Sequence, residues 1–276
     1  MSRVTASMLG LVLAASALLG ASGCHRNTAP LTVFVPCGQI GPFYNIEKLW
    51  KQQNPGVPMT WKFDNMVVMT DKVLSGASKP DVFLSMGDLE VDRLQKAGLV
   101  VEGTRAQYAD NAVAITVPIE DPGGVSRIED LANPSVKRIA VPDPEKNSVG
   151  RHAIEALKAA GVYSQVEGKI AQTAYAADGK EMSEGGQVEA TFAYYPCVSE
   201  VHVPGQPPAE VTGIKVVMVP QQDYHVFSCE AVVLKGAKNP EAGRKLIALL
   251  KSPEAQKIFA QWNFRRDLAP AAPAAK

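Results

Sequence analysis

The cysteines at positions 24, 37, 197 and 229 are the side chains of this chain with the most versatile chemistry. A thiolate is a nucleophile, a ligand for soft metal ions and one half of a disulfide. The last three cysteines lie far apart in the sequence, so no compact zinc-ribbon spacing predicts a local metal site. Any site that they share must therefore be assembled by folding.

Cys24 follows an N-terminal segment with the features of an export signal. Arg3 precedes an apolar run, and the small residues Ala21-Ser22-Gly23 lead into the cysteine. This pattern resembles the lipobox of bacterial lipoproteins, in which the thiol is acylated; a plain secretory signal or a membrane span are the alternatives, and the run falls short of the ~20 residues that a span needs. We predict a lipoprotein signal peptide over 1–23, lipidation of Cys24, and a tether over 24–30. The protein would then be lipid-anchored at the periplasmic or extracytoplasmic face of a bacterial membrane.

The composition is that of a globular protein without a polyanionic partner. Hydrophobic residues make up 46% of the chain, and the formal net charge is zero with evenly spread lysines. A chain of this length can bury a core as one large domain or two smaller ones. We expect a monomer that does not bind nucleic acid.

Short β-branched runs alternate with helical patterns, which is typical of an α/β fold. The predicted strands are 31–35, 59–63, 81–85, 113–117, 138–141, 190–194, 215–219 and 228–234. The predicted helices are 42–53, 67–75, 88–97, 150–160, 180–185, 240–251 and 253–262. We expect mainly parallel strands with helices on both faces, arranged in two lobes.

The division into lobes follows from the loops and the order of the strands. Lobe I is predicted to comprise 31–114 and a return segment, 225–268, that carries a strand and the C-terminal helices. Lobe II is predicted over 115–224. The Ala/Pro-rich end, 269–276, is expected to be disordered.

Several segments together resemble the type II periplasmic solute-binding proteins, and most closely the molybdate-binding type of ABC importers. They are Leu31-Thr-Val-Phe34, Lys79-Pro-Asp-Val-Phe-Leu-Ser85, Asp143-Pro-Glu145 with Val149-Gly150, Glu189-Ala190 with Tyr194, and Ser252-Pro-Glu-Ala-Gln-Lys-Ile-Phe259. The resemblance covers nearly the whole mature chain. It implies two α/β lobes with mixed, mainly parallel sheets and a ligand cleft between them. It also implies a receptor that performs no catalysis, needs no cofactor and delivers a small inorganic ligand, molybdate or tungstate, to an ABC permease and its ATPase. The alternative is that the protein is a ligand sensor and is not coupled to transport.

The resemblance also implies the ligand-binding positions. Backbone N–H groups of Val149 and Ala176 and the phenol of Tyr194 would hold the anion, because helix N-termini offer unpaired donors. Gly38 and Met66 stand where the family has two ligand-binding serines, so two hydroxyls are missing.

Sulfur-containing side chains are expected in the region where these two hydroxyls are missing. Cys37, Cys197 and Cys229 are all expected near the cleft, and with Met66 they would suit Cu(I), another soft metal ion or a metalloid. The pKa of Cys37 would be lowered if it caps the following helix. In the alternative interpretation the sulfurs pack in the core or form a disulfide. A Cys37–Cys197 bond would hold the lobes shut, whereas a Cys197–Cys229 bond would not.

The residues that an enzyme would need are poorly placed. His225 and Cys229 are four residues apart on a predicted strand, ~13 Å along an extended segment, and no glycine-rich nucleotide motif follows a strand. His152 is predicted to be a solvated helix residue rather than a ligand. We therefore predict that the protein is not an enzyme.

Overall fold

The computed structural model describes residues 29–198, 200–201, 206–225 and 227–264. The predicted signal peptide, Cys24 with most of the tether, and the tail 269–276 lie outside the described residues. Within the described residues, no helix is long and apolar enough to cross a membrane.

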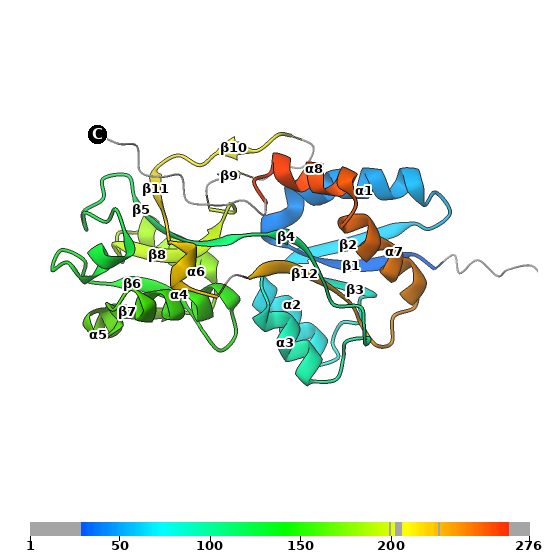
Figure 1. The fold of residues 1–276 in the computed structure, drawn as a ribbon, viewed down its shortest axis with the longest axis horizontal. Helices are drawn as coiled ribbons and strands as arrows, with labels where there is room; N and C mark the ends of the chain where they lie inside the picture. Colours follow the sequence, from blue (N-terminus) through cyan, green and yellow to red (C-terminus); the bar gives the residue numbers. More distant parts are fainter. Residues whose placement is uncertain (1–28, 199, 202–205, 226, 265–276) are drawn as a thin grey trace, which may run out of the picture.

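The first sheet has the strand order β2-β1-β3-β12-β4 (Figure 1). Its strands are β1 (Leu31–Pro36), β2 (Met59–Asp64), β3 (Val82–Ser85), β4 (Ala106–Asp110) and β12 (Ser228–Val233). β1 is parallel to β2 and β3, whereas β12 is antiparallel to β3 and β4. The accompanying helices are α1 (Ile40–Gln53), α2 (Met66–Leu74), α3 (Leu89–Lys96), α7 (Pro240–Leu250) and α8 (Pro253–Gln261).

Both faces of this sheet are covered, which explains its nearly continuous apolar strands. Phe34, Phe83 and Val232 face α2 and α3 in one buried cluster. Residues of opposite parity, such as Val33 and Val82, join the larger cluster under α1, α7 and α8. Figure 1 shows α2 and α3 on one side of the sheet and α1 and α8 on the other.

The second sheet has the order β11-β5-β8-β6-β7. Its strands are β5 (Ala112–Pro118), β6 (Ile139–Pro142), β7 (Ile170–Thr173), β8 (Ala190–Tyr195) and β11 (Ile214–Met218). β6 is parallel to β7 and β8, and β5 is antiparallel to β8 and β11. Its helices are α4 (Ser148–Ala159), α5 (Tyr163–Val166) and α6 (Ala176–Glu184), and a short pair, β9 (Glu200–Val201) and β10 (Ala209–Glu210), follows β8.

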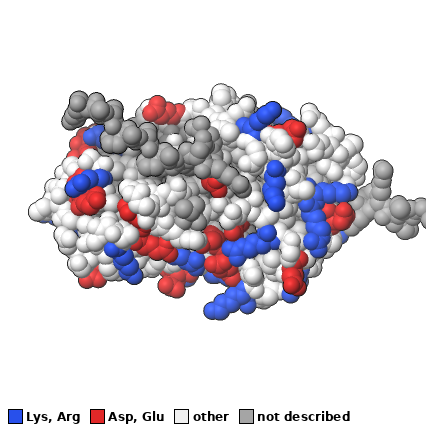
Figure 2. Space-filling model, viewed as in Figure 1, with Lys and Arg blue, Asp and Glu red and all other residues white. Residues whose placement is uncertain are grey.

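Two lobes result, each built on one mixed five-stranded sheet, as the resemblance implied. The chain leaves the first sheet after Asp110, enters the second at Ala112, and returns between Met218 and Ser228. Lysine and arginine side chains are interspersed with acidic ones on the face shown in Figure 2.

Some elements differ from the sequence predictions. β4 and β7 have weak strand patterns and were not predicted; they are the last strands of their sheets, each paired on one side. α6 begins at Ala176 rather than Lys180, because Asp178 accepts a hydrogen bond from the N–H of Tyr175 (3.0 Å) and so starts the helix earlier.

Candidate functional site

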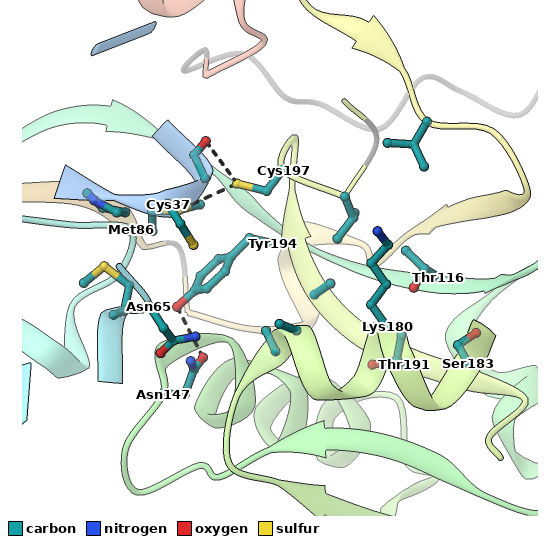
Figure 3. A pocket seen from close by; sticks show the side chains of 18 of the residues that line it. Cys37, Asn65, Met86, Thr116, Asn147, Lys180, Ser183, Thr191, Tyr194 and Cys197 are labelled. Atoms are coloured by element: carbon teal, nitrogen blue, oxygen red, sulfur yellow. Dashed lines mark hydrogen bonds between the residues drawn. The ribbon is translucent and has the colours of Figure 1, made fainter. Parts of the chain in front are cut away.

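A cavity of about 390 Å³ lies between the two lobes. Its volume is within the ~300–1,000 Å³ range of small-molecule sites. The first lobe contributes Pro36, Cys37, Gly38, Asn65, Met66 and Met86. The second contributes Thr116, Asn147, Ala176, Ala177, Lys180, Ser183, Glu184, Thr191, Ala193, Tyr194, Cys197, Val198, Val211 and Ile214 (Figure 3).

Most of the predicted ligand-binding residues line this cavity. They are Cys37, Gly38, Met66, Ala176, Tyr194 and Cys197. Val149 and Cys229 do not line it, and each has a local structural reason.

The backbone N–H of Val149 is already used within the protein. It donates to Asn147 Oδ1 (3.0 Å) and to the hydroxyl oxygen of Tyr194 (3.2 Å). Because Asn147 caps α4 and Val149 is fully buried, this helix N-terminus does not present the Val149 donor to a ligand. Burial keeps the pKa of Tyr194 well above its ordinary value, so its phenol stays protonated.

Cys229 is buried inside the first lobe and does not line the cavity. Its Sγ accepts a hydrogen bond from Gln39 Nε2 (3.1 Å) and a longer one from Asn111 Nδ2 (3.6 Å). Burial raises the pKa of this thiol well above its ordinary value.

The three cysteines of the alternative metal site do not come together here. Cys37, Cys197 and Cys229 form no disulfide with one another, and no group of three or more His, Cys, Asp or Glu side chains in the described residues is arranged to hold a metal ion. The pKa of Cys37 is also raised rather than lowered, chiefly because the surrounding protein removes water from the thiol. Cys37 does not cap α1, whose preceding residue is Gln39.

Cys197 fills the space that a side chain at position 38 would need. A Cβ built on Gly38 would lie 2.2 Å from Cys197 Sγ and 2.9 Å from Met86 Sδ. The Cys197 thiol, from the second lobe, also lies 3.5 Å from the Gly38 carbonyl oxygen and 3.7 Å from Met86 Sδ, both in the first lobe. At the position where the resemblance implies a serine, this chain thus has a sulfur contact between the lobes.

Sequence reasoning missed Asn65 and Asn147, which line the cavity from opposite lobes. Each directly precedes a helix and caps it through Oδ1: Asn65 accepts from the N–H of Val67 (2.9 Å), as Asn147 does from Val149. An asparagine before a helical pattern is a helix-start signal that could have singled out both residues.

Comparison with known proteins gives the family. The model of the family described as bacterial extracellular solute-binding protein matches residues 31–265. This chain is a bacterial extracellular solute-binding protein. Proteins of this family are non-enzymatic receptors of ABC transporters, which agrees with the prediction that the chain is not an enzyme.

The relatives of this solute-binding protein are distant. It is 24% identical to a molybdate-binding protein of Azotobacter vinelandii over 262 residues, covering 94% of this chain and 98% of the relative. The solved periplasmic molybdate-binding protein of Azotobacter vinelandii superposes with a TM-score of 0.67 at 16% identity, over 85% of this chain and 98% of that one. A sulfate-binding protein of Mycobacterium tuberculosis gives a TM-score of 0.68 at 16% identity, over 86% of both chains. These structural matches establish the two-lobe fold.

A buried carboxylate joins the two lobes of this solute-binding protein beside the cavity. Glu90, in the first turn of α3, is fully buried and accepts hydrogen bonds from the N–H (3.1 Å) and the hydroxyl of Ser148, the first residue of α4. Ser148 Oγ accepts in turn from the N–H of Leu89 (3.0 Å). Burial raises the pKa of Glu90, so its neutral, protonated form is favoured in this contact at the N-terminus of α4.

A second set of contacts between the lobes involves Asp88, two residues before Glu90. His152 Nε2 lies 3.1 Å from Asp88 of the first lobe, and Nδ1 lies 2.9 Å from Glu155. The His152 ring is 1% exposed and stacks on Phe227 with a centroid distance of 4.3 Å, so the prediction that it is solvated is wrong. Arg151 adds a weaker ion pair with Asp88 (3.6 Å).

These contacts shift two pKa values in opposite directions. Burial alone would raise the pKa of Asp88, but the hydrogen bond and charge of His152, with the charge of Arg151, lower it to about 2. Burial alone would lower the pKa of His152, but its hydrogen bonds with Asp88 and Glu155 raise it above 6.5. A protonated His152 therefore favours the closed lobes.

We expect the closed form to lose stability as the pH rises. The stability that protonated His152 gives to the closed form is fully present below pH 6.5. It is lost as the pH rises through the raised pKa of His152. Glu90 acts in the same direction, because ionisation of its buried carboxyl disfavours closure. The melting temperature measured from pH 6 to pH 9 should fall, and in His152→Gln, which can still donate to Asp88, it should fall less. Equal slopes in both proteins would contradict a role for His152.

Proposed function

We propose that this protein binds a small anion for an ABC importer, and that the anion lies in the cavity between the lobes. The observation that carries the proposal is that the side-chain amides of Asn65 and Asn147 line the cavity from opposite lobes, beside the Tyr194 phenol, which itself donates to Asn147 Oδ1 (3.4 Å). Uncharged donors hold an anion and still allow its release to a permease. The names of the relatives make molybdate and tungstate the first inorganic candidates.

The proposal includes the position of the receptor in the cell. Acylation of Cys24 would hold the lobes at the extracytoplasmic face of the membrane, beside the permease and its ATPase. The tether over 24–30 would leave the cleft free to open and close.

A thiophilic ligand is the second candidate. Four sulfur-containing residues, Cys37, Met66, Met86 and Cys197, line the same cavity. This set differs from the predicted three thiolates, because Met86 joins it and Cys229 does not. The raised pKa of Cys37 disfavours its thiolate, which is the form that binds soft cations, so we place this candidate second.

A thermal-shift series tests both candidates. We expect stabilisation by anions from a panel of molybdate, tungstate, sulfate and phosphate together with small carboxylates and phosphonates. A ligand at 100 times its Kd should raise the melting temperature by roughly 5–10 °C. A shift with Cu(I) or arsenite alone, abolished by thiol alkylation, would contradict the anion proposal and support the second candidate.

A further inference from the structure

The side-chain amides of Asn65 and Asn147 have an unusual division of roles. In each residue Oδ1 accepts the N–H of the second residue of its own helix, Val67 or Val149. This bond fixes which end of each amide is oxygen, since only oxygen can accept it. The Nδ2 groups are therefore directed away from the helices.

Neither Nδ2 group makes a hydrogen bond with the described part of the chain, and both residues line the cavity. Asn147 is 1% exposed. Its Nδ2 is nevertheless not fully enclosed by protein atoms. In Figure 3 both amides lie below the Tyr194 phenol. A buried amide that uses only its acceptor in this way indicates a place for a ligand.

An amide NH₂ group can only donate, so the matching ligand group must accept. Carboxylate, phosphonate and sulfonate oxygens do so, whereas ammonium groups and metal cations do not. Because the two amides belong to different lobes, one ligand group that binds both would bridge the closed cleft.

The cavity has more room than a bare inorganic ion of five heavy atoms needs, because its volume of about 390 Å³ lies in the range of small-molecule sites. Apolar walls from Ala193, Val198, Val211 and Ile214 continue the cavity along α6. The charged side chains in its lining, Lys180 and Glu184, are more than half exposed and pair with each other at 3.4 Å.

We infer that the solute is a small organic acid. Asn65 and Asn147 hold its oxygen-rich head, and its apolar body lies between α6 and the second sheet. This inference rests on the anion receptor proposed above and narrows the class of anion.

Calorimetric titration of the purified protein with two homologous series tests the inference. One series is acetate, butyrate and hexanoate, and the other is inorganic phosphate, methylphosphonate and butylphosphonate, with molybdate as the inorganic reference. Affinity should rise by about fourfold for each methylene that enters the cavity. The series that binds with the higher affinity identifies the head group of the ligand as carboxylate or phosphonate.

Substitutions at the two asparagines test the head. Asn65→Asp and Asn147→Asp keep a capping oxygen for α2 and α4 but remove the donor and add a negative charge. Asn65→Ser and Asn147→Ser keep a cap without the charge. We expect at least a hundredfold loss of affinity in the aspartate variants, about a tenfold loss in the serine variants, and none in Asn133→Asp, which does not line the cavity.

Three results would count against the inference. Molybdate that binds more tightly than every alkyl compound would overturn the organic-acid assignment and leave the anion receptor intact. Affinities that are unchanged in all four asparagine variants would overturn the role of the amides alone. Binding of no anion at all would count against both the inference and the proposed function.

Discussion

Glu90→Ala is expected to separate the two lobes. The substitution removes the acceptor of both the Ser148 N–H and the Ser148 hydroxyl from a fully buried contact. Leaving such groups without partners costs about 3 kcal/mol, which is a shift of roughly a hundredfold from closed to open. We expect a larger radius of gyration by small-angle X-ray scattering and about a hundredfold weaker ligand binding.

Glu90→Gln is the matched control for this prediction. Its amide oxygen can still accept the Ser148 N–H, and its shape is that of the protonated carboxyl that the raised pKa of Glu90 favours. We expect near wild-type compactness and a weaker dependence of closure on pH. Equal scattering curves for Glu90→Ala and the wild type would show that this contact does not hold the lobes together.

Gly38→Ala is expected to block closure by a different mechanism. The added Cβ would lie 2.2 Å from Cys197 Sγ, far inside the distance of ordinary contact, and 2.9 Å from Met86 Sδ. Overpacking of this kind costs about 1–3 kcal/mol, so ligand affinity measured by calorimetry should fall by roughly 5- to 150-fold. The unfolding transition of each lobe should change little, because the clash exists only when the lobes meet.

A second substitution on the opposite lobe should restore the fit. Cys197→Ala alone leaves room beside Gly38, and in Gly38→Ala/Cys197→Ala the new methyl group occupies the space of the lost sulfur. We expect the double variant to recover most of the affinity that Gly38→Ala loses, a positive coupling between residues in contact. Additive losses in the double variant would contradict the close approach of position 38 and Cys197.

The sequence by itself determined the order of the strands and helices, because periodicity and helix-end signals act over a few neighbouring residues. The resemblance, which rests on several segments between Leu31 and Phe259, indicated the two-lobe fold and placed Tyr194, Ala176 and Met66 at the cleft. Weak strands such as β4 escaped prediction, since pairing with β12 rather than intrinsic propensity stabilises them.

Only the tertiary structure decided which chemical groups face the ligand. Cys229 lies on a strand near the cleft, but the register of β12 directs its thiol to Gln39 inside the first lobe. Val149 begins a helix as expected, yet Asn147 and Tyr194 use its N–H. The contacts of Glu90 with Ser148 and of Cys197 with Gly38 join residues that are far apart in the sequence and belong to different lobes. Such contacts depend on how two separately folded lobes dock, and no local pattern in the sequence encodes that geometry.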